Sequence, residues 1–260
     1  MSENMNIIVI TGASSGIGEE FLRQYDQMIR YKCEFWLIGR NTDKLYALTK
    51  ELLNPCRIFA YDLSGEEWIE DWNQVLKKNQ PSVRLLINSA GYGLSGIFSD
   101  LDLKEQSGCI DLNCRALTQM TYTCIPYMSR NARMIQMASS AAFLPQPGFA
   151  VYAASKAYVM SFARALKREL KKKNISITIV CPGPVDTPFF TRGNNHAATG
   201  SLKRIAMKKP AAVVKQAIRD AGKRREFSIC GGMMQNVFIL SKIIPHAFLM
   251  TLMKICTGRK

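Results

Sequence analysis

A tyrosine and a lysine, Tyr152 and Lys156, stand four residues apart in a stretch with helical periodicity, which places both side chains on one helix face. A phenol with an ordinary pKa of about 10 exchanges protons poorly at neutral pH. A neighbouring ammonium stabilises the phenolate, so we expect Lys156 to lower the pKa of Tyr152 and make it a general acid/base. Such a pair taken alone is common by chance and is usually solvated, so the surrounding sequence must decide.

A glycine-rich segment follows the first apolar run, residues 6–10, and reads Thr11-Gly12-Ala13-Ser14-Ser15-Gly16-Ile17-Gly18. Glycines let the backbone turn tightly and approach a pyrophosphate, and the N-terminus of the next helix offers free N–H groups to the phosphates. Its position between a strand and a helix favours a dinucleotide-binding turn over an ordinary glycine turn.

The second apolar run ends in Gly39-Arg40-Asn41. An acidic residue here would bind the ribose 2′-hydroxyl of NAD, whereas an arginine pairs with the 2′-phosphate of NADP. Lys44, one helical turn further, adds positive charge. The alternative is a solvated surface arginine. We therefore expect NADP(H) as the cofactor.

Strands that are buried on both faces are the elements predicted to position these residues. Nearly continuous apolar runs occur at residues 6–10, 34–38, 57–61, 83–87, 133–138, 175–181 and 227–230. Such runs are typical of a parallel sheet, and the intervening stretches are long enough for crossover helices. The pattern predicts one α/β domain over residues 1–260, with a Rossmann-like, doubly wound parallel sheet of about seven strands and helices on both faces.

The helix that carries Tyr152 shows the clearest periodicity. We expect its apolar face to consist of residues that recur every four positions, with Val159 and Ala163 beside them; they are Ala154, Tyr158, Phe162, Leu166 and Leu170. The helix is expected to stop at Asn174.

Two segments interrupt the alternation of strands and helices. Residues 186–209 contain Pro188, Gly193 and Gly200 and are predicted to form a substrate loop or lid. Residues 233–256 are apolar but include Lys242 and Pro245. A spanning helix needs about twenty apolar residues, so this tail is predicted to be a buried or surface-docked helical pair.

Charge is unevenly distributed along the 260 residues. Residues 1–150 hold 14 Lys and Arg against 16 Asp and Glu, whereas residues 151–260 hold 21 against 4. A basic half attracts phosphates, anionic lipid or nucleic acid. The eight cysteines form no C-x-x-C pair and the start of the chain has no signal-peptide pattern, so we expect reduced thiols in a cytoplasmic protein, with peripheral association with the membrane as the alternative. With two histidines, a metal site is not expected.

Taken together, these motifs resemble the short-chain dehydrogenase/reductase family, in its compact single-domain branch. The resemblance covers roughly residues 6–190 and rests on motifs in the family's order: T-G-x-x-x-G-I-G at 11–18, Asp62-Leu63, Asn88-Ser89-Ala90-Gly91, Asn113, Ser139, Tyr152-x-x-x-Lys156 and Pro182-Gly183-Pro184-Val185-Asp186-Thr187. Asn88-Ser89 stands where the family often has two asparagines. Ser139 is preferred to Ser140 because it lies thirteen residues before Tyr152.

The resemblance implies a role for each matching residue. Ser139 would polarise the substrate carbonyl, Asn113 would hold a water near Lys156, and Lys156 would also bind the nicotinamide ribose. The cofactor cleft would be lined by the glycine-rich turn and Arg40 together with Asp62, Leu63, Asn88, Ala90, Gly91, Pro182, Gly183, Val185 and Thr187. Hydride would pass between the nicotinamide and a carbonyl carbon while Tyr152 handles the proton.

The substrate is expected to be a lipophilic ketone or alcohol, of acyl or steroid type, because the loops nearest the chemistry are apolar; the candidates are Phe143, Leu144, Pro145, Phe149, Phe189 and Phe190. A non-catalytic NADP-binding regulator and a membrane-surface protein are the alternatives. The apolar tail favours a homo-oligomer, with weak association with an anionic membrane second. Nucleic acid is not expected, because no recognition motif accompanies the charge.

Overall fold

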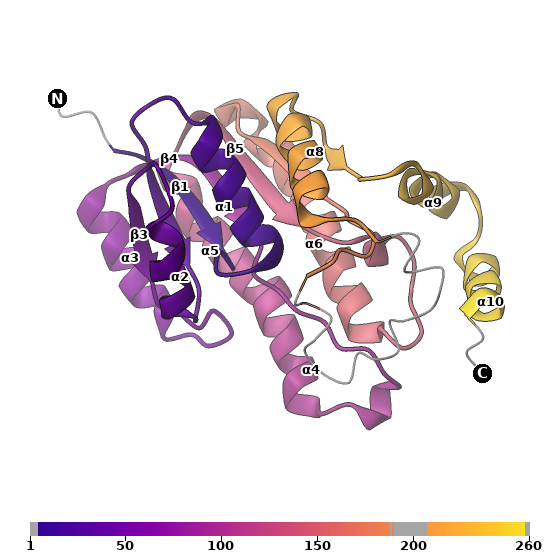
Figure 1. Cartoon of the computed structure of the whole chain (residues 1–260). Coiled ribbons are helices and arrows are strands. Elements are labelled where there is room, and N and C mark those ends of the chain that lie inside the picture. The colour runs from indigo at the N-terminus through magenta and orange to yellow at the C-terminus, as the bar shows by residue number, and fades with distance from the viewer. Residues whose placement is uncertain (1–4, 188, 190–206, 258–260) are drawn as a thin grey trace.

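A single seven-stranded sheet lies at the centre of the molecule (Figure 1). The computed structural model describes residues 5–187, 189 and 207–257. The strand order is β3-β2-β1-β4-β5-β6-β7 and every pairing is parallel. The strands are β1 (Asn6–Thr11), β2 (Glu34–Ile38), β3 (Cys56–Phe59), β4 (Ser82–Asn88), β5 (Met128–Met137), β6 (Ser176–Val180) and β7 (Phe227–Ser228). The predicted Rossmann-like α/β fold is confirmed.

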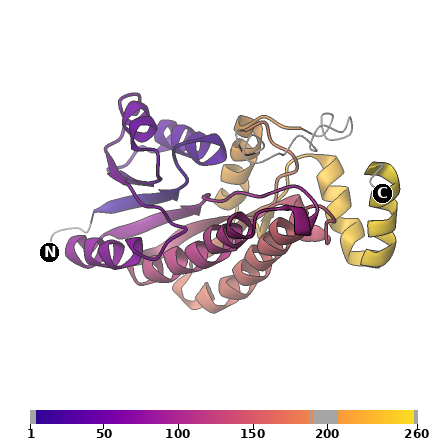
Figure 2. The same ribbon diagram turned by 90° about the horizontal axis from the view of Figure 1, so that it is seen from below.

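Helices cover both faces of the sheet, as Figure 2 shows edge-on. One layer holds α1 (Gly16–Met28), α2 (Thr42–Thr49) and α8 (Pro210–Gly222). The other holds α3 (Trp68–Asn79), α5 (Leu117–Cys124) and α6 (Ala150–Glu169). The remaining described elements are α4 (Leu103–Ile110), the π-helical η2 (Asp111–Ala116), and the short 3₁₀ segments η1 (Phe98–Asp100), η3 (Ile125–Tyr127), η4 (Ser140–Phe143) and η5 (Leu170–Lys173).

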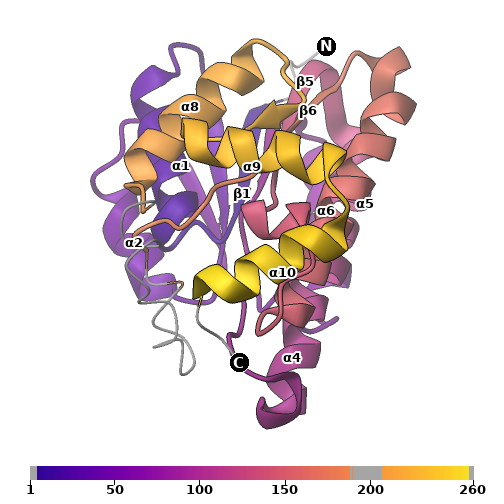
Figure 3. The same cartoon turned by 90° about the vertical axis from the view of Figure 1, so that its right-hand side faces the viewer.

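The apolar tail forms two helices, α9 (Gly232–Ile243) and α10 (His246–Thr257), separated at Pro245. They lie at the end of the molecule toward which the strands point (Figures 2 and 3). The predicted helical pair is therefore present. Among the described residues, no helix is long and apolar enough to cross a membrane.

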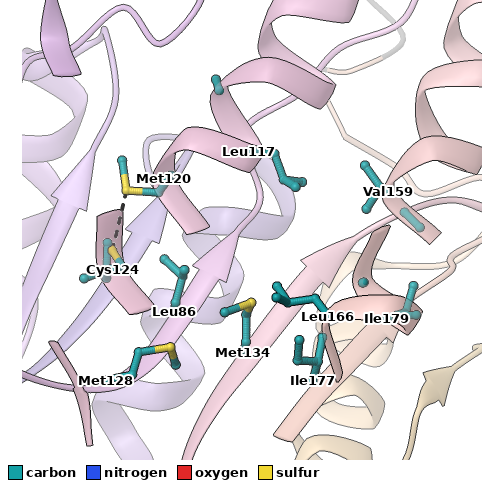
Figure 4. Packing of buried hydrophobic residues seen from close by; sticks show 14 of the residues in the cluster. Leu86, Leu117, Met120, Cys124, Met128, Met134, Val159, Leu166, Ile177 and Ile179 are labelled. Carbon is teal, nitrogen blue, oxygen red and sulfur yellow. Dashed lines mark hydrogen bonds between the residues drawn. The ribbon is translucent and has the colours of Figure 1, made fainter. Parts of the chain in front are cut away.

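The core on the α3–α5–α6 face shows why these runs become strands. Leu86 of β4, Met134 of β5 and Ile177 of β6 are fully buried. They face Leu117 and Met120 of α5 and Val159 and Leu166 of α6 (Figure 4). Burying such side chains on both faces of the sheet is the main driving force that favours this fold.

Three predicted details differ from the structure. Strand β5 begins at Met128, five residues before the predicted start, and β7 spans only two residues. In α6 the buried residues include Val159, Ala163 and Leu166, whereas Ala154 is exposed and Tyr158 is 43% exposed. The apolar row predicted through Ala154 and Tyr158 is therefore wrong. Asn174 does end the following turn, in the left-handed conformation with φ 55°.

Candidate active site

Most of the predicted site residues meet in one cleft of about 740 Å³ at the carboxyl ends of the strands. In an open parallel sheet this is the edge where ligands bind, at the point where the strand order reverses between β1 and β4. The predicted residues that line it are Gly12, Ser14, Ser15, Gly16, Ile17, Arg40, Asp62, Leu63, Ala90, Gly91, Ser139, Tyr152, Lys156, Pro182, Gly183, Val185 and Thr187.

Four predicted site residues, Thr11, Gly18, Asn88 and Asn113, do not line this cleft but support its wall from behind. The Thr11 hydroxyl accepts hydrogen bonds from the backbone N–H groups of Ser89 and Ala90, at 3.1 Å each. A Cβ on Gly18 would lie 2.2 Å from the Gly12 carbonyl oxygen. Thr11 and Gly18 therefore set the shape of the glycine turn, and this role does not need either residue to contact a cofactor.

Asn88 belongs to a buried polar network beneath the cleft. Its side-chain amide donates to the Thr121 hydroxyl at 2.9 Å and to Gln136 Oε1 at 3.1 Å. Gln136 Nε2 in turn donates to Thr121 at 3.1 Å. Since buried amides are costly to leave unpaired, this network holds the end of β4 against β5 and α5.

The glycine turn has the backbone that only glycine adopts readily. Gly12 has φ +68°, and a Cβ there would lie 2.9 Å from Ala90 Cα. Helix α1 begins at Gly16 with no side-chain capping bond at Ser15. The first N–H groups of α1 therefore lie at the cleft without a side-chain cap, which is the arrangement that binds phosphate at helix N-termini.

Charged residues gather at the end of the cleft beside β2. Arg40 Nη1 lies 3.5 Å from Asp62 Oδ2, and both side chains are about half exposed. Lys44 lines the same end. Burial acts to raise the pKa of Asp62, but hydrogen bonds from Ser64 and the charge of Arg40 outweigh it and hold that pKa below its ordinary value. The Arg40 guanidinium is thus held at the surface of the cleft by a carboxylate.

Tyr152 and Lys156 lie at the other end of the cleft, on the first turns of α6. Lys156 Nζ lies 5.8 Å from the centre of the Tyr152 ring and donates a hydrogen bond to the Met137 carbonyl oxygen at 2.9 Å. Lys156 is only 4% exposed. The predicted pairing on one helix face is therefore present, with the ammonium anchored to the end of β5.

The pKa values of this pair differ from the sequence prediction. Burial raises the pKa of Tyr152 to about 12, and the hydrogen bond with Ser139 acts in the opposite direction. Burial lowers the pKa of Lys156 to about 8. The expected lowering of the Tyr152 pKa by Lys156 is not found, because desolvation of the phenol dominates in this cleft.

Ser139 follows β5 and is buried beside the tyrosine, with which it shares a hydrogen bond. Its hydroxyl also accepts a hydrogen bond from the Ala141 N–H at 3.1 Å. Ser140 lines the cleft too, but it is the first residue of the 3₁₀ turn η4. The geometry agrees with the choice of Ser139 as the partner of Tyr152.

Asn113 acts as a clamp between the loop after β4 and helix α6. Its Oδ1 accepts from the Tyr92 N–H at 3.1 Å, and its Nδ2 donates to the Tyr92 carbonyl at 2.8 Å and to Ser155 Oγ at 2.9 Å. It lies in the π-helical segment η2, a local widening of the helix that is common at functional sites. A Cβ on Gly91 would lie 2.7 Å from Asn113 Oδ1 and 3.3 Å from Lys156 Nζ.

Sequence reasoning missed three residues that shape this end of the cleft. A Cβ on Gly93 would lie 2.4 Å from Tyr152 Cδ2, so only glycine lets the phenol ring occupy its position. Ser155 donates to the Tyr152 carbonyl at 2.7 Å while accepting from Asn113. Cys109 Sγ lies 3.3 Å from Asn113 Nδ2. The position of Ser155 in the sequence between Tyr152 and Lys156 could have identified it as a site residue. No sequence pattern indicated the contacts of Gly93 and Cys109.

The cleft also has an apolar wall. It is contributed by α9 and α10 through Met233, Met234, Val237, Leu240 and Leu249. A Cβ on Gly183 would lie 3.0 Å from Met234 Cγ, so the tail packs directly on the segment after β6. The tail is therefore docked on the body of the protein, which covers part of its apolar surface.

The aromatic candidates divide in the structure. Leu144, Phe149 and Phe189 line the cleft, and the Phe149 and Phe189 rings lie 5.9 and 5.4 Å from that of Tyr152. Phe143 is instead buried against Phe238 of α9, with ring centres 4.9 Å apart, and Pro145 does not line the cleft. Phe190 lies outside the described residues, as do residues 188 and 190–206 of the loop predicted at 186–209.

Comparison with known proteins establishes the family. The model of the short chain dehydrogenase family matches residues 6–198, so this chain belongs to that family and is an oxidoreductase of it. The match ends before α8, α9 and α10.

Individual relatives agree with this assignment. An uncharacterized oxidoreductase of Staphylococcus epidermidis is 29% identical over 199 residues, covering 76% of this chain and 85% of the relative. Sulfoacetaldehyde reductase 2 of Chromohalobacter salexigens is 30% identical over 210 residues, covering 76% and 81%.

Solved structures share the fold at lower identity. A short-chain dehydrogenase of Sphingobium yanoikuyae in complex with NADPH superposes with a TM-score of 0.77 at 22% identity, covering 95% of this chain and 96% of that one. A short-chain dehydrogenase/reductase of Burkholderia phymatum in complex with NAD gives 0.79 at 19%, covering 92% and 94%. Both types of nicotinamide cofactor therefore occur among structures with this fold.

Proposed function

We propose that this oxidoreductase uses NADP(H) to interconvert a carbonyl and an alcohol on a lipophilic substrate. The observation that carries the proposal is the arrangement of one cleft, with Arg40 and Lys44 at one end, Tyr152 and Lys156 at the other, and an apolar wall beside them. This spacing of a phosphate-binding end and a proton-transfer end suits a dinucleotide that reaches from one to the other.

The residues present fit such a cofactor. The turn at Gly12 and the start of α1 would bind the pyrophosphate, and Arg40 with Lys44 would bind the 2′-phosphate. Asp62 and Leu63 would lie against the adenine, Lys156 would bind the nicotinamide ribose, and Thr187 would lie near the carboxamide. When bound, the reduced nicotinamide supplies a hydride.

The proton is the contribution of the chain itself. With its pKa raised by burial, the Tyr152 phenol holds its proton at neutral pH and can donate it to a carbonyl oxygen. Ser139, hydrogen-bonded to Tyr152, would orient that oxygen. The Asn113 clamp would hold the loop at Tyr92 and the start of α6, which carries Lys156, in fixed relative positions.

The preference for NADP over NAD is part of the same proposal and rests on Arg40. The direct test is to measure oxidation of NADPH and of NADH with a panel of carbonyl compounds that runs from short aldehydes to steroids and acyl thioesters. We expect turnover that is faster with NADPH and with the lipophilic members. Equal use of the two cofactors would contradict the NADP assignment, and cofactor binding without turnover on any member would favour the non-catalytic regulator.

Other expectations from the sequence stay predictions. We propose a cytoplasmic protein that acts on a small molecule and does not bind nucleic acid, and the homo-oligomer expected from the sequence stays a prediction. Sedimentation of the full chain and titration with duplex DNA would test the last two. No group of three His, Cys, Asp or Glu side chains that could hold a metal occurs within residues 5–187, 189 and 207–251.

A further inference from the structure

Helices α9 and α10 keep an apolar face exposed although their inner face is docked. The inner face includes Met234, Val237, Phe238 and Leu249, which pack on the core. The outer residues are large and apolar, with exposed fractions between 44% and 74%; they are Met233, Ile239, Leu240, Ile243 and Phe248, defined here as the tail patch. Large apolar side chains exposed together on one pair of helices point to an interaction site, because a soluble protein rarely leaves a large apolar patch uncovered.

The sequence of the tail carries positive charge and no negative charge. Residues 227–260 contain four Lys and Arg residues and no Asp or Glu. Lys242 on the same helix α9 is exposed, and its Nζ lies 4.5 Å from the centre of the Phe238 ring. Exposed Lys208 lies beside the start of α9, with its Cε 3.4 Å from the position of a Cβ on Gly231. An apolar face bordered by basic side chains matches an anionic lipid surface.

The length of the helices sets how they can meet a membrane. Each has 12 residues, which is about 18 Å of helix, whereas the hydrocarbon core of a bilayer is about 30 Å thick. Helices this short lie in the plane of the interface, with the apolar face toward the acyl chains.

The tail patch and the mouth of the cleft share residues. Met233 and Leu240 are 49% and 44% exposed, and both also line the cleft. A surface that covers the patch therefore also meets the apolar rim of the cleft. Figure 3 shows α9 and α10 together on the side of the molecule that would face it.

We infer that α9 and α10 dock the enzyme on an anionic membrane, with the tail patch in the lipid interface, and thereby open the cleft to carbonyl compounds dissolved in the bilayer. The inference rests on the proposed function for its substrate, but the docking itself does not depend on turnover. A second copy of the chain is the less favoured occupant. Two patches that meet about a two-fold axis would bring Lys242 and its equivalents together with no acidic residue in either tail to pair with them.

Vesicle flotation of the full chain tests the docking. We expect binding to phosphatidylcholine vesicles that contain phosphatidylglycerol, weakened by high salt and by removal of the anionic lipid. Ile243→Glu and Phe248→Glu alter patch residues outside the cleft, and each should lower the partition coefficient at least about tenfold. Leu103→Glu is the matched control, since Leu103 on α4 is 73% exposed against 74% for Ile243, and it should bind as the natural protein does.

Tryptophan quenching tests whether the cleft rim reaches the lipid. The native Trp36, Trp68 and Trp72 are at most 3% exposed, so brominated phospholipids should leave their emission unchanged. Tryptophan introduced as Leu240→Trp or Phe248→Trp should be quenched by anionic vesicles with brominated chains, and Leu103→Trp should not.

Failure of the docking and failure of the function give different results. A chain that oxidises NADPH with soluble ketones but ignores anionic vesicles overturns the docking and leaves the function intact. Binding and quenching without turnover on any carbonyl overturn the function and leave the docking intact. A dimer in sedimentation that Ile243→Glu dissociates, together with no flotation, would assign the patch to a second copy and contradict the inference.

Discussion

The two walls of the cleft are built in opposite ways. On the polar wall Lys156 is buried and hydrogen-bonded, and so are Asn113 and the Thr11 hydroxyl behind it, so each group has one position. On the apolar wall, Met233 and Leu240 are nearly half exposed and Met234 is a flexible side chain packed on Gly183. Hydrogen-bonded groups hold reacting atoms in place, whereas methionines adapt to ligands of varied shape.

This difference predicts that changes in the polar wall alter the chemistry, and changes in the apolar wall alter which substrate binds. The largest effect is expected at Tyr152. Tyr152→Phe removes the proton donor and should lower kcat at least about a hundredfold while cofactor affinity changes little. Stopped-flow binding of NADPH and steady-state turnover measure the two separately.

The control for that variant lies on the same helix. Tyr158 of α6 is 43% exposed and its hydroxyl is 2.8 Å from that of Thr118, far from the cleft wall. Tyr158→Phe should keep nearly full activity. If Tyr152→Phe retains more than a few per cent of kcat, the assignment of the proton to Tyr152 is wrong.

A smaller effect is expected at the charged end. Arg40→Asp removes the partner of the 2′-phosphate and places a negative charge beside Asp62, so preference should shift from NADPH toward NADH. A charge-assisted hydrogen bond contributes about 1.5–3 kcal/mol, which corresponds to a shift of about tenfold or more in the ratio of kcat/KM values.

Arg30→Asp makes the same change in net charge at a site outside the cleft, where Arg30 donates to the backbone carbonyls of Gln27 and Ile29. It should leave the preference unchanged. If the unaltered protein has equal kcat/KM for NADPH and NADH, then Arg40 does not determine the cofactor preference as proposed.

Burial of the polar wall has a consequence for stability. The pKa of Lys156 is about 8 in the folded chain against an ordinary 10.5, so between these values the unfolded chain binds more protons. Stability therefore rises with pH above about 8, by at most about 1.4 kcal/mol per pH unit from this residue. Buried cysteines such as Cys124 and Cys181, with pKa values raised from 9.0 to about 12, act in the opposite direction above pH 9.

Urea unfolding at several values between pH 7.5 and 9 isolates the lysine. From pH 7.5 to pH 9 the free energy of unfolding of the natural chain should rise relative to that of Lys156→Met, because methionine at position 156 does not titrate. Parallel pH profiles for the two proteins would show that Lys156 is not desolvated as the structure indicates.

Much of the fold was predictable because its strands are continuous apolar runs bounded by turns. The predicted start of β5 was too late because Ser129, Arg130 and Asn131 are polar, although Met128 already pairs with Val83 of β4 before an irregularity, after which the pairing resumes at Arg133. The buried face of α6 was misplaced because that face carries Ser155 and Lys156, which a search for apolar periodicity excludes. Residues buried for chemistry break the pattern that identifies residues buried for packing.

The site divides in the same way. The glycine turn, Arg40, Ser139, Tyr152 and Lys156 were predicted from local motifs, and the structure brings them to one cleft. A docked helical tail was predicted, but the contacts that make it a wall of the cleft were not, because they depend on Met234 meeting Gly183 from a distant part of the chain. No local pattern encodes such a contact.

The smallest effect is expected on that apolar wall. Val237→Ala removes two carbons from a partly buried residue that lines the cleft, and each methylene contributes about 0.8 kcal/mol when fully buried. With partial contact, kcat/KM for a long-chain ketone should fall roughly fivefold, mainly through KM, whereas a short ketone that does not reach α9 should be unaffected. Steady-state kinetics with both ketones measure the difference, and Leu103→Ala on α4 controls for loss of an apolar side chain outside the cleft. An equal loss of kcat for both ketones would mean that α9 supports the position of Tyr152 and Lys156, and the division of labour between the two walls would then be wrong.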